Sequence, residues 1–237
     1  MNASNNSLAG LRVAVTGGTS GLGLALVAQL HRRGAKVAFV ARDAARVAAV
    51  AAKFPGAHGI VADVASKEAT HPLALQITSA LGGLDVLVNN ASTLGPAALV
   101  PLADTECEDF EAALAANLMG PFRLTKALLG ALASSARQGR PALVVNITSD
   151  AGVNAYPTWG AYGASKAALA HMSRTWDEEL KEHGVRVIGH DPGDMDTPMH
   201  AQALPDADPA ELKAPSTSAA ELLDRIATML VREEAAA

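Results

Sequence analysis

The sequence predicts an α/β protein built on a doubly wound parallel sheet with helices on both faces. Short apolar runs rich in β-branched residues alternate with longer helical stretches, and this alternation indicates parallel strands joined by helical crossovers. The runs are apolar throughout, which is typical of a sheet covered on both faces. Polar and glycine-rich motifs directly follow several of the runs. We therefore expect the strand order 3-2-1-4-5-6, with a ligand-binding crevice at the carboxyl ends of the strands.

The strands and helices can be assigned in order along the chain. The expected strands cover residues 13–15, 37–40, 59–61, 86–88, 143–147 and 185–188. The expected helices cover residues 22–33, 43–53, 66–82, 104–136 and 160–183. Residues 201–217 are rich in Pro, Asp and Ala, which indicates a loop or short helices over the crevice, and residues 218–233 have the pattern of a last amphipathic helix. We expect a flexible N-terminus over residues 1–10 and a single domain over 11–237, in which 194–217 form a substrate loop.

Composition limits the classes of partner. The chain of 237 residues is long enough for a sizeable core, and its 49% hydrophobic against 3% aromatic residues mean that Ala, Val and Leu fill that core. A net charge of −5 with scattered basic residues argues against a nucleic acid or an anionic membrane as a partner. The single cysteine, Cys107, excludes an internal disulfide. No apolar run approaches a membrane span, and the histidines show no metal-binding spacing. We expect a cytoplasmic protein without a metal site.

A glycine-rich turn joins the first expected strand to the first expected helix. The turn has the sequence Thr16-Gly17-Gly18-Thr19-Ser20-Gly21-Leu22-Gly23. A strand, a glycine loop and a helix in this order direct backbone N–H groups and the helix dipole at a phosphate. Gly17 permits the tight turn, Gly21 permits close approach to a pyrophosphate, and Gly23 lets the helix pack on the strand. An ordinary βα loop is the alternative interpretation. The strand and helix context favours dinucleotide binding.

Tyr162 and Lys166 are placed to act together. They lie four residues apart in an expected helix, so the phenol and the ammonium share one helix face. An ammonium about 4 Å from a phenol can lower the phenol pKa toward neutrality. The pair therefore has the chemistry of a proton shuttle. A tyrosine and a lysine that merely share an exposed face are the alternative.

These motifs together resemble those of the short-chain dehydrogenase/reductase family, in its single-domain branch with a Rossmann-type fold. The matching residues, from about residue 10 to about 200, are Thr16-Gly17-x-x-x-Gly21-x-Gly23, Asn89-Asn90-Ala91, the set Asn117, Ser149, Tyr162 and Lys166, and Asp191-Pro192-Gly193 followed by Thr197. The chain departs from the family at Ser92, which stands where the family has glycine and adds a Cβ close to the cofactor ribose. It also lacks the family's usual seventh strand.

The resemblance implies a hydride-transfer site. Tyr162 would be the general acid/base, Lys166 would lower its pKa and hold the nicotinamide ribose, and Ser149 would hydrogen-bond the substrate oxygen. Asn117 would kink its helix and hold a water that relays protons to Lys166. A turn serine and an exposed helix position are the alternatives for Ser149 and Asn117. The implied cofactor contacts are Thr16, Gly17, Thr19, Ser20, Gly21, Leu22, Gly23, Arg42, Asp63, Val64, Asn90, Ala91, Tyr162, Lys166, Pro192, Gly193 and Thr197.

The end of the second expected strand favours NADP over NAD. The family position whose acidic residue selects NAD corresponds to Ala41, and Arg42 follows it. A guanidinium there suits the 2′-phosphate of NADP. Asp43 is expected to cap the following helix instead of binding a ribose hydroxyl.

The expected function is an NADP(H)-dependent carbonyl reductase or alcohol dehydrogenase. No arginine is placed to bind a carboxylate, so the expected substrate is a neutral ketone, aldehyde or secondary alcohol. The expected substrate contacts are Ser149, Asn154, Tyr156, Trp159, Met195 and Met199. A catalytically silent NADP-sensing regulator of the same fold is the alternative, and an epimerase or dehydratase of the extended branch is a third. The family also implies a homodimer through the helices at 104–136 and 160–183.

Overall fold

A parallel sheet forms the centre of the structure, a computed structural model that describes residues 8–96 and 98–236. Its strands are β1 (Arg12–Thr16), β2 (Lys36–Ala41), β3 (His58–Val61), β4 (Val86–Asn89), β5 (Leu143–Ile147) and β6 (Arg186–His190). They pair in the order β3-β2-β1-β4-β5-β6, and every pairing is parallel. The predicted order is confirmed. The part of the chain that the structure describes forms no seventh strand.

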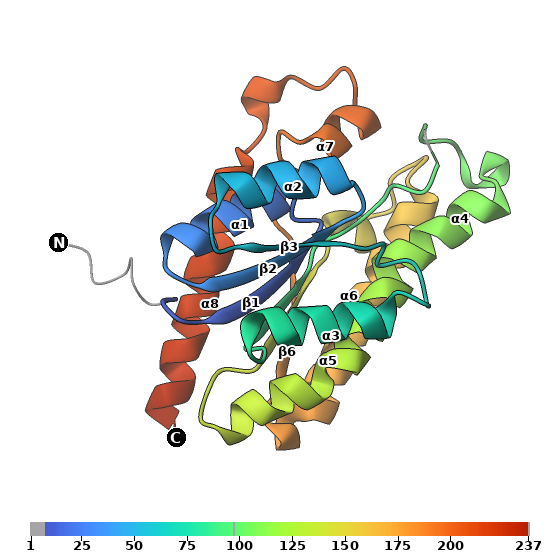
Figure 1. Cartoon of the computed structure of the whole chain (residues 1–237). Coiled ribbons are helices and arrows are strands. Elements are labelled where there is room, and N and C mark those ends of the chain that lie inside the picture. Colours follow the sequence, from blue (N-terminus) through green and yellow to red (C-terminus); the bar gives the residue numbers. More distant parts are fainter. Residues whose placement is uncertain (1–7, 97, 237) are drawn as a thin grey trace.

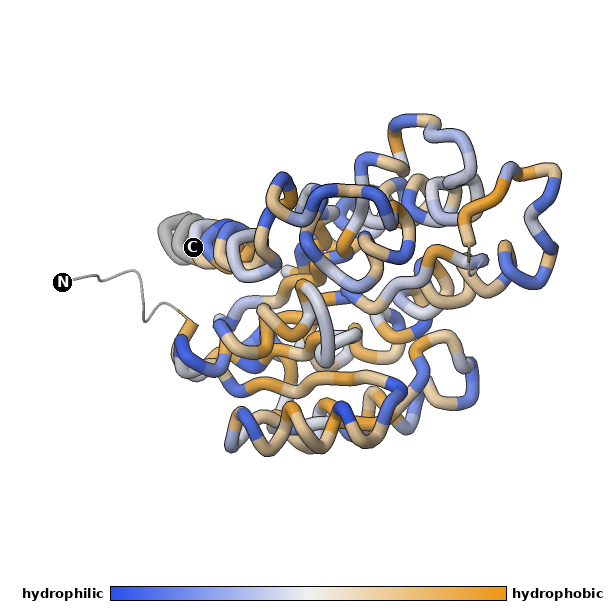
Figure 2. Tube along the Cα trace, turned by 90° about the horizontal axis from the view of Figure 1, so that it is seen from above, coloured by the Kyte–Doolittle hydropathy of each residue, from blue (hydrophilic) through white to orange (hydrophobic). Residues whose placement is uncertain are grey.

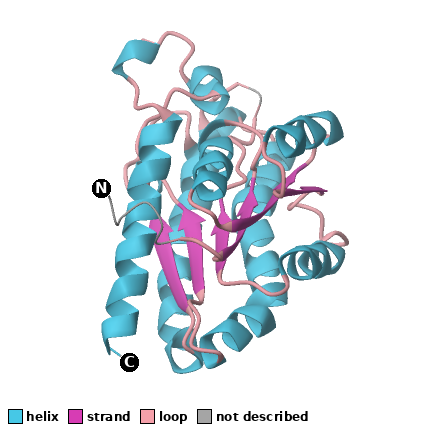
Figure 3. Cartoon of the chain, turned by 60° about the vertical axis from the view of Figure 1, so that its left-hand side comes forward, coloured by secondary structure: helices cyan, strands magenta, loops and turns pink. Residues whose placement is uncertain are grey.

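Helices cover both faces of the sheet (Figures 1 and 3). They are α1 (Gly21–Arg32), α2 (Ala44–Lys53), α3 (Thr70–Leu81), α4 (Cys107–Leu114), α5 (Gly120–Arg137), α6 (Gly160–Leu180), α7 (Pro198–Ala203) and α8 (Pro215–Ala236). A π-helical segment, Ala115–Met119, joins α4 to α5, and 3-10 turns occur at Leu102–Asp104, Asp150–Gly152, Lys181–His183 and Pro209–Glu211. None of the helices in the described ranges combines the length and the apolar character needed to cross a bilayer.

Two apolar layers sandwich the sheet because successive strand residues point to opposite faces. In β1, Val13 and Val15 pack with α1, α2 and α8, whereas Ala14 packs on the other face with α3 and α5. All three residues are buried, as predicted for a doubly covered sheet. The central strands accordingly lie in the hydrophobic interior of the chain in Figure 2.

The predicted flexible N-terminus, residues 1–10, is described by the structure only from Leu8 onward. Residues 1–7 of the expected flexible segment lie outside the described residues. Leu8 is fully buried in the core, and the Gly10 amide donates to the Gly34 carbonyl at 2.9 Å. The described chain therefore enters the core before β1 begins.

The helix predicted over 104–136 is broken, which corrects the sequence-based boundary. A 3-10 turn ends at Asp104, α4 begins at Cys107, and the π-helical segment interrupts the helical pattern before α5. Alanine-rich sequence favours an unbroken helix. Asn117 accepts a hydrogen bond from the Thr93 amide and donates one to Ser165 at this break, and π-bulges are frequent at functional sites.

Two other helix starts depend on side-chain hydrogen bonds. The expected helix at 66–82 begins at Thr70, because the Asp63 and Ser66 side chains accept bonds from the amides of Ala65 and Ala69 and form a turn before it. Asp43 caps α2 by accepting from the Arg46 amide at 3.0 Å, as predicted.

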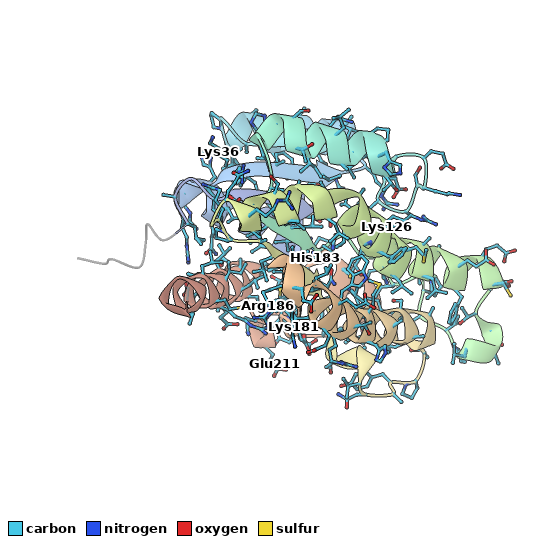
Figure 4. All side chains as sticks on the ribbon, turned by 90° about the horizontal axis from the view of Figure 1, so that it is seen from below. Lys36, Lys126, Lys181, His183, Arg186 and Glu211 are labelled. Atoms are coloured by element: carbon cyan, nitrogen blue, oxygen red, sulfur yellow. The ribbon has the colours of Figure 1, made fainter. Side chains whose placement is uncertain are left out.

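Charged side chains lie at the amino ends of the strands. Asp85 is fully buried there, and its oxygens lie 2.6 Å from Arg12 Nη2 and 2.6 Å from Arg140 Nη2. Arg186 pairs with Asp177 where α6 leads into β6, beside Lys181 and His183 (Figure 4). These ion pairs therefore lie at the amino ends of the strands, whereas the glycine-rich and polar motifs lie at the carboxyl ends.

Candidate active site

The glycine loop is held against the loop after β4 by Asn90. Asn90 Nδ2 lies 2.8 Å from the Thr16 carbonyl oxygen, and the Thr16 hydroxyl accepts from the amides of Asn90 and Ala91 at 2.9 and 3.0 Å. The approach leaves no room for side chains. A Cβ on Gly23 would lie 2.1 Å from the Gly17 oxygen, and one on Gly17 would lie 2.8 Å from Asn90 Nδ2. These glycines therefore bring two loops together at the point where the strand order reverses.

A cavity of about 940 Å³ opens at the carboxyl ends of the strands. The glycine loop and the end of β2 line it, as do the loops after β3, β4, β5 and β6. Its volume lies at the upper end of the range typical of small-molecule and cofactor sites. Gly21 has a φ of +47°, and a Cβ on it would lie 3.1 Å from the Cγ2 atom of Thr197. The glycine loop and the start of α7 therefore face each other closely.

Gly163 lets the tyrosine and the serine line the same cavity. Ser149 follows β5 and begins a 3-10 turn, in which its Oγ atom accepts from the Ala151 amide at 3.2 Å. A Cβ on Gly163 would lie 2.7 Å from the Ala151 oxygen, so glycine permits α6 to pack directly on this turn. Tyr162, beside that glycine, and Ser149 both line the cavity.

Lys166 is anchored below Tyr162. Its Nζ atom donates to the Ile147 carbonyl at 2.7 Å and lies 5.4 Å from the centroid of the Tyr162 ring. The side chain is 2% exposed. Because β5 ends at Ile147 and the two side chains share α6, the end of the strand fixes the ammonium relative to the phenol.

Burial dominates the proton affinities of this pair. Burial raises the pKa of Tyr162 to about 12, opposed by the Ser149 and Ser92 hydroxyls and reinforced by the charges of Asp191 and Asp150. Burial lowers the pKa of Lys166 to about 8. Among the protein groups, burial therefore sets the pKa of Tyr162 above its ordinary value, and the lowering expected from Lys166 together with an oxidised nicotinamide stays a prediction. The ammonium donates to the Ile147 carbonyl and not to the phenol, and burial is the largest cause of the raised pKa of Tyr162.

Asn117 connects three segments of the site. Its Oδ1 atom accepts from Ser92 Oγ at 3.0 Å and from the Thr93 amide at 2.9 Å. Its Nδ2 atom donates to the Thr93 carbonyl at 2.8 Å and to Ser165 Oγ at 2.9 Å. Asn117 is 1% exposed, which rules out the alternative of an exposed helix position. With two bonds accepted and two donated, the side-chain amide is fully engaged and has no bond left for the expected water.

Two arginines line the cavity beyond the end of β2. Arg42 was expected there, and Arg46 on the first turn of α2 joins it. The Asp43 carboxylate between them caps α2 and lies 3.7 Å from Arg46 Nε. This end of the cavity therefore offers two guanidinium groups and one carboxylate already engaged by the protein.

Most expected site residues line the cavity, and four do not. The expected residues that line it are Gly17, Thr19, Ser20, Gly21, Leu22, Arg42, Asp63, Val64, Asn90, Ala91, Ser149, Tyr156, Trp159, Tyr162, Lys166, Pro192, Gly193, Met195, Thr197 and Met199. Thr16, Gly23, Asn117 and Asn154 are absent from the lining. Thr16 and Gly23 shape the glycine loop, Asn117 supports Ser92 and Thr93, and Asn154 Nδ2 lies 3.4 Å from the Tyr156 hydroxyl.

Sequence reasoning missed the contributions of Arg46 and Ser92. The signal for Arg46 was its spacing of four residues from Arg42 at a helix start. Ser92 was noted only for its added bulk, yet its hydroxyl donates to Asn117 and its φ is not positive. Glycine's conformational freedom is therefore not needed at this position.

Backbone hydrogen bonds join the two ends of the segment from Asp194 to Lys213, which precedes α8. The Asp196 amide donates to the Lys213 carbonyl at 3.0 Å, and the Lys213 amide donates to the Asp194 carbonyl at 3.1 Å. The buried Ser218 hydroxyl donates to the Pro192 carbonyl at 2.9 Å. The residues between these contacts, including α7, project from the top of the molecule in Figure 1.

Comparison with known proteins identifies the family. The model of the short chain dehydrogenase family matches residues 12–208. A 2,5-dichloro-2,5-cyclohexadiene-1,4-diol dehydrogenase of Sphingobium indicum is 36% identical over 84% of this chain and 78% of its own length. An L-xylulose reductase of Bos taurus is 31% identical over 92% of this chain and 82% of its own length. The protein belongs to the short-chain dehydrogenase/reductase family of oxidoreductases, which act on alcohol and carbonyl groups.

Solved structures support the same assignment. A short chain dehydrogenase from Shigella flexneri complexed with NADP has a TM-score of 0.82 and 28% identity, covering 89% of each chain. A 3-ketoacyl-(acyl-carrier-protein) reductase from Brucella melitensis complexed with NADH has a TM-score of 0.85 and 25% identity, covering 91% of this chain and 90% of its own. Similar folds therefore bind either nicotinamide cofactor.

Proposed function

We propose that the protein is an NADP(H)-dependent oxidoreductase that interconverts a carbonyl and a secondary alcohol, with Tyr162 as the general acid/base. One observation carries the proposal: Tyr162, Ser149 and Lys166 line the same cavity as the glycine loop. The convergence supplies an acid, a hydrogen-bond donor and a cation beside a phosphate-binding loop. When bound, the nicotinamide supplies or accepts the hydride.

In the reducing direction, the phenol of Tyr162 gives its proton to the substrate oxygen as that oxygen gains charge. The Ser149 hydroxyl donates to the same oxygen and stabilises the developing charge. A phenol with a pKa raised to about 12 is fully protonated near neutral pH and is available as an acid. In the oxidising direction the phenol must lose its proton first. The positive charge of an oxidised nicotinamide and a charged Lys166 would both favour that loss.

The residues of the cavity fit NADP at the end of β2. A 2′-phosphate would lie between the guanidinium groups of Arg42 and Arg46, which suit its charge and its acceptor oxygens. The strand ends at Ala41, which has no carboxylate for a ribose hydroxyl, and Asp43 is engaged as a helix cap. Both features favour the phosphorylated cofactor.

Calorimetric titration and absorbance at 340 nm test these assignments separately. Tyr162→Phe should bind NADPH with a Kd close to that of the unaltered protein and lose at least 100-fold in turnover of a ketone panel. Arg42→Ala should weaken NADPH binding about tenfold or more and leave NADH binding nearly unchanged. Retained turnover in Tyr162→Phe would overturn the role of the tyrosine. Tight NADPH binding with no turnover of any ketone or alcohol would favour the sensing regulator.

We also propose that two copies of the chain pair through α5 and α6. Phe122 on α5 and Trp176 on α6 are partly exposed and lie in contact, with ring centroids 5.4 Å apart. Lys126 Nζ lies 6.0 Å from the Phe122 ring centroid. Light scattering should give twice the chain mass, and Phe122→Glu should shift it toward the monomer. A monomer at micromolar concentration would contradict the proposal.

A further inference from the structure

Among the described residues, the lining at the substrate end of the cavity includes carboxylates and no exposed Lys or Arg. Asp150, Asp191 and Asp194 line the cavity between the end of β5 and α7. The Lys166 ammonium in this region is buried and bound to the Ile147 carbonyl. The charges of Asp191 and Asp150 both raise the pKa of Tyr162, so both act on the atom that exchanges the proton. This charge disfavours a substrate that carries its own carboxylate.

Asp150 stands out because it is bonded to the serine that would hold the reacting oxygen. Ser149 Oγ donates to Asp150 Oδ1 at 3.3 Å. The other carboxylate oxygen accepts from the Tyr156 hydroxyl at 2.6 Å, and Asn154 Nδ2 lies 3.4 Å from that hydroxyl. This tyrosine bond holds the pKa of Asp150 below its usual value. The carboxylate is therefore ionised at neutral pH and held beside Ser149 by a neighbouring side chain.

The spacing between the two groups matches a particular substrate geometry. Ser149 Oγ and Asp150 Oδ1 lie 3.3 Å apart, so two oxygen atoms on adjacent carbons, as in a vicinal diol or an α-hydroxy ketone, can each reach one of them at hydrogen-bond distance. An oxygen on the reacting carbon can accept from Ser149. A hydroxyl on the adjacent carbon can then donate to Asp150.

Binding such a substrate exchanges one donor to Asp150 for another. The hydrogen of the Ser149 hydroxyl points at Asp150, and it must turn to the reacting oxygen when substrate binds. A substrate hydroxyl on the adjacent carbon replaces the lost bond. A substrate without that hydroxyl does not replace the bond that Asp150 loses, so it binds with one hydrogen bond fewer.

We propose that Asp150, braced by Tyr156, is a specificity-determining residue that selects uncharged α-hydroxy ketones and the corresponding vicinal diols over simple ketones and oxo acids. This inference rests on the proposed function, because it assumes that the reacting oxygen binds Ser149. Reduction adds hydride to the carbonyl carbon and the Tyr162 proton to its oxygen. The adjacent hydroxyl is unchanged by the reaction.

A set of three aromatic ketones tests the proposal with the full-length protein and NADPH. 2-Hydroxyacetophenone carries the donor, 2-methoxyacetophenone has a similar structure without it, and phenylglyoxylate carries a carboxylate. The unaltered protein should prefer the hydroxy ketone to the methoxy ketone by about tenfold or more in kcat/KM. Asp150→Ala should reduce that preference to within about threefold. Asp150→Asn should improve kcat/KM for phenylglyoxylate, because it removes the repelling charge.

Two further variants separate the effect from general damage. Tyr156→Phe removes the brace and should lower the hydroxy-over-methoxy preference without abolishing turnover of the methoxy ketone. Asp104→Asn removes one charge outside the cavity lining and should leave the preference unchanged. A preference below twofold in the unaltered protein, or one that survives in Asp150→Ala, would overturn the proposal.

Binding measurements distinguish a failure of this proposal from a failure of the proposed function. Trp159 lies in the cavity wall with its ring centroid 5.7 Å from that of Tyr162, so its fluorescence reports ligand binding. If no ketone is turned over, the proposed function fails. In that case, the Kd values of 2-hydroxyacetophenone and 2-methoxyacetophenone can be measured by titrating each ketone into the NADP complex. Their ratio then still tests whether Asp150 selects the hydroxyl.

Discussion

Ser92 Oγ donates a hydrogen bond to Asn117 Oδ1 at 3.0 Å, and the same hydroxyl lowers the pKa of Tyr162. The serine is the residue at which this chain departs from its family's motif. Its hydroxyl belongs to the same group of contacts that Asn117 makes with Thr93 and Ser165. Serine in place of glycine therefore adds a hydrogen-bonding group to the site, and the loop accommodates it without a positive φ.

Restoring glycine at this position should make the tyrosine harder to ionise. The Ser92 hydroxyl lowers the pKa of Tyr162, so Ser92→Gly and Ser92→Ala should both raise it. Alcohol oxidation needs the deprotonated phenol, and its rate should therefore rise at higher pH in both variants than in the unaltered protein. The dependence of kcat/KM on pH measures the shift. An unchanged profile in Ser92→Ala would show that the hydroxyl does not act on Tyr162.

Removing the charge of Asp191 should have the opposite effect. The Asp191 carboxylate raises the pKa of Tyr162, and its Oδ1 atom accepts from the Gly193 amide at 2.9 Å. Asp191→Asn keeps an acceptor for that amide and removes the charge. The pH profile of alcohol oxidation should therefore move to lower pH, whereas Asp104→Asn should not move it. A shift to higher pH would contradict the electrostatic account.

Gly23→Ala should disrupt the cofactor loop. The added Cβ would lie 2.1 Å from the Gly17 oxygen, a distance that forces the loop to move. NADPH binding should weaken by more than about tenfold, as measured by calorimetry. Gly130→Ala on α5 is the matched control, since a Cβ there meets nothing within 4 Å. That control should raise the free energy of unfolding by about 0.5–1 kcal/mol and leave binding unchanged.

Asp85 should make the free energy of unfolding fall in acid. Burial alone would raise its pKa, but hydrogen bonds from Arg140 and Arg12 outweigh burial and lower it to about 2. Because the folded-state pKa lies below the unfolded one, the stabilisation is present above about pH 4 and is lost as the pH falls toward 2. Asp85→Asn should cost about 3 kcal/mol at pH 7 by urea denaturation, because two arginines lose their partner.

A surface ion pair provides the control for that experiment. Arg33 and Asp224 lie 2.8 Å apart, but the Asp224 side chain is 68% exposed. Asp224→Asn should cost less than about 0.5 kcal/mol. Equal losses in the two variants would show that the buried carboxylate has no special role.

The fold was predictable from the sequence because its signals are local. Apolar runs such as 143–147 become fully buried strands, and the alternation of strands with helices gives the order of the sheet. The glycines at 17 and 23 were also predictable, since a strand, a tight turn and a helix leave no space for side chains there. Asp43 caps its helix through a bond to a residue three positions away, which the sequence alone indicates.

The remaining features depend on contacts between distant residues. The π-helical segment includes Asn117, whose partners Thr93 and Ser165 lie 24 and 48 residues away in the sequence. Burial decides the pKa of Tyr162, and four-residue spacing to Lys166 does not reveal that the ammonium binds the Ile147 carbonyl. The bond between Asp150 and Tyr156 crosses a turn whose shape no local pattern specifies.

The paired backbone bonds between residues 194–196 and 213 have a practical consequence for engineering. They hold the two ends of the segment that contains α7 next to each other at its junction with the rest of the protein. Because Thr197 faces Gly21 near one of those ends, a segment grafted between them must keep Thr197 if the glycine loop is to keep its shape. Substitutions within α7 would therefore change the cavity wall at Met199 and Ala203 and leave the sheet as it is.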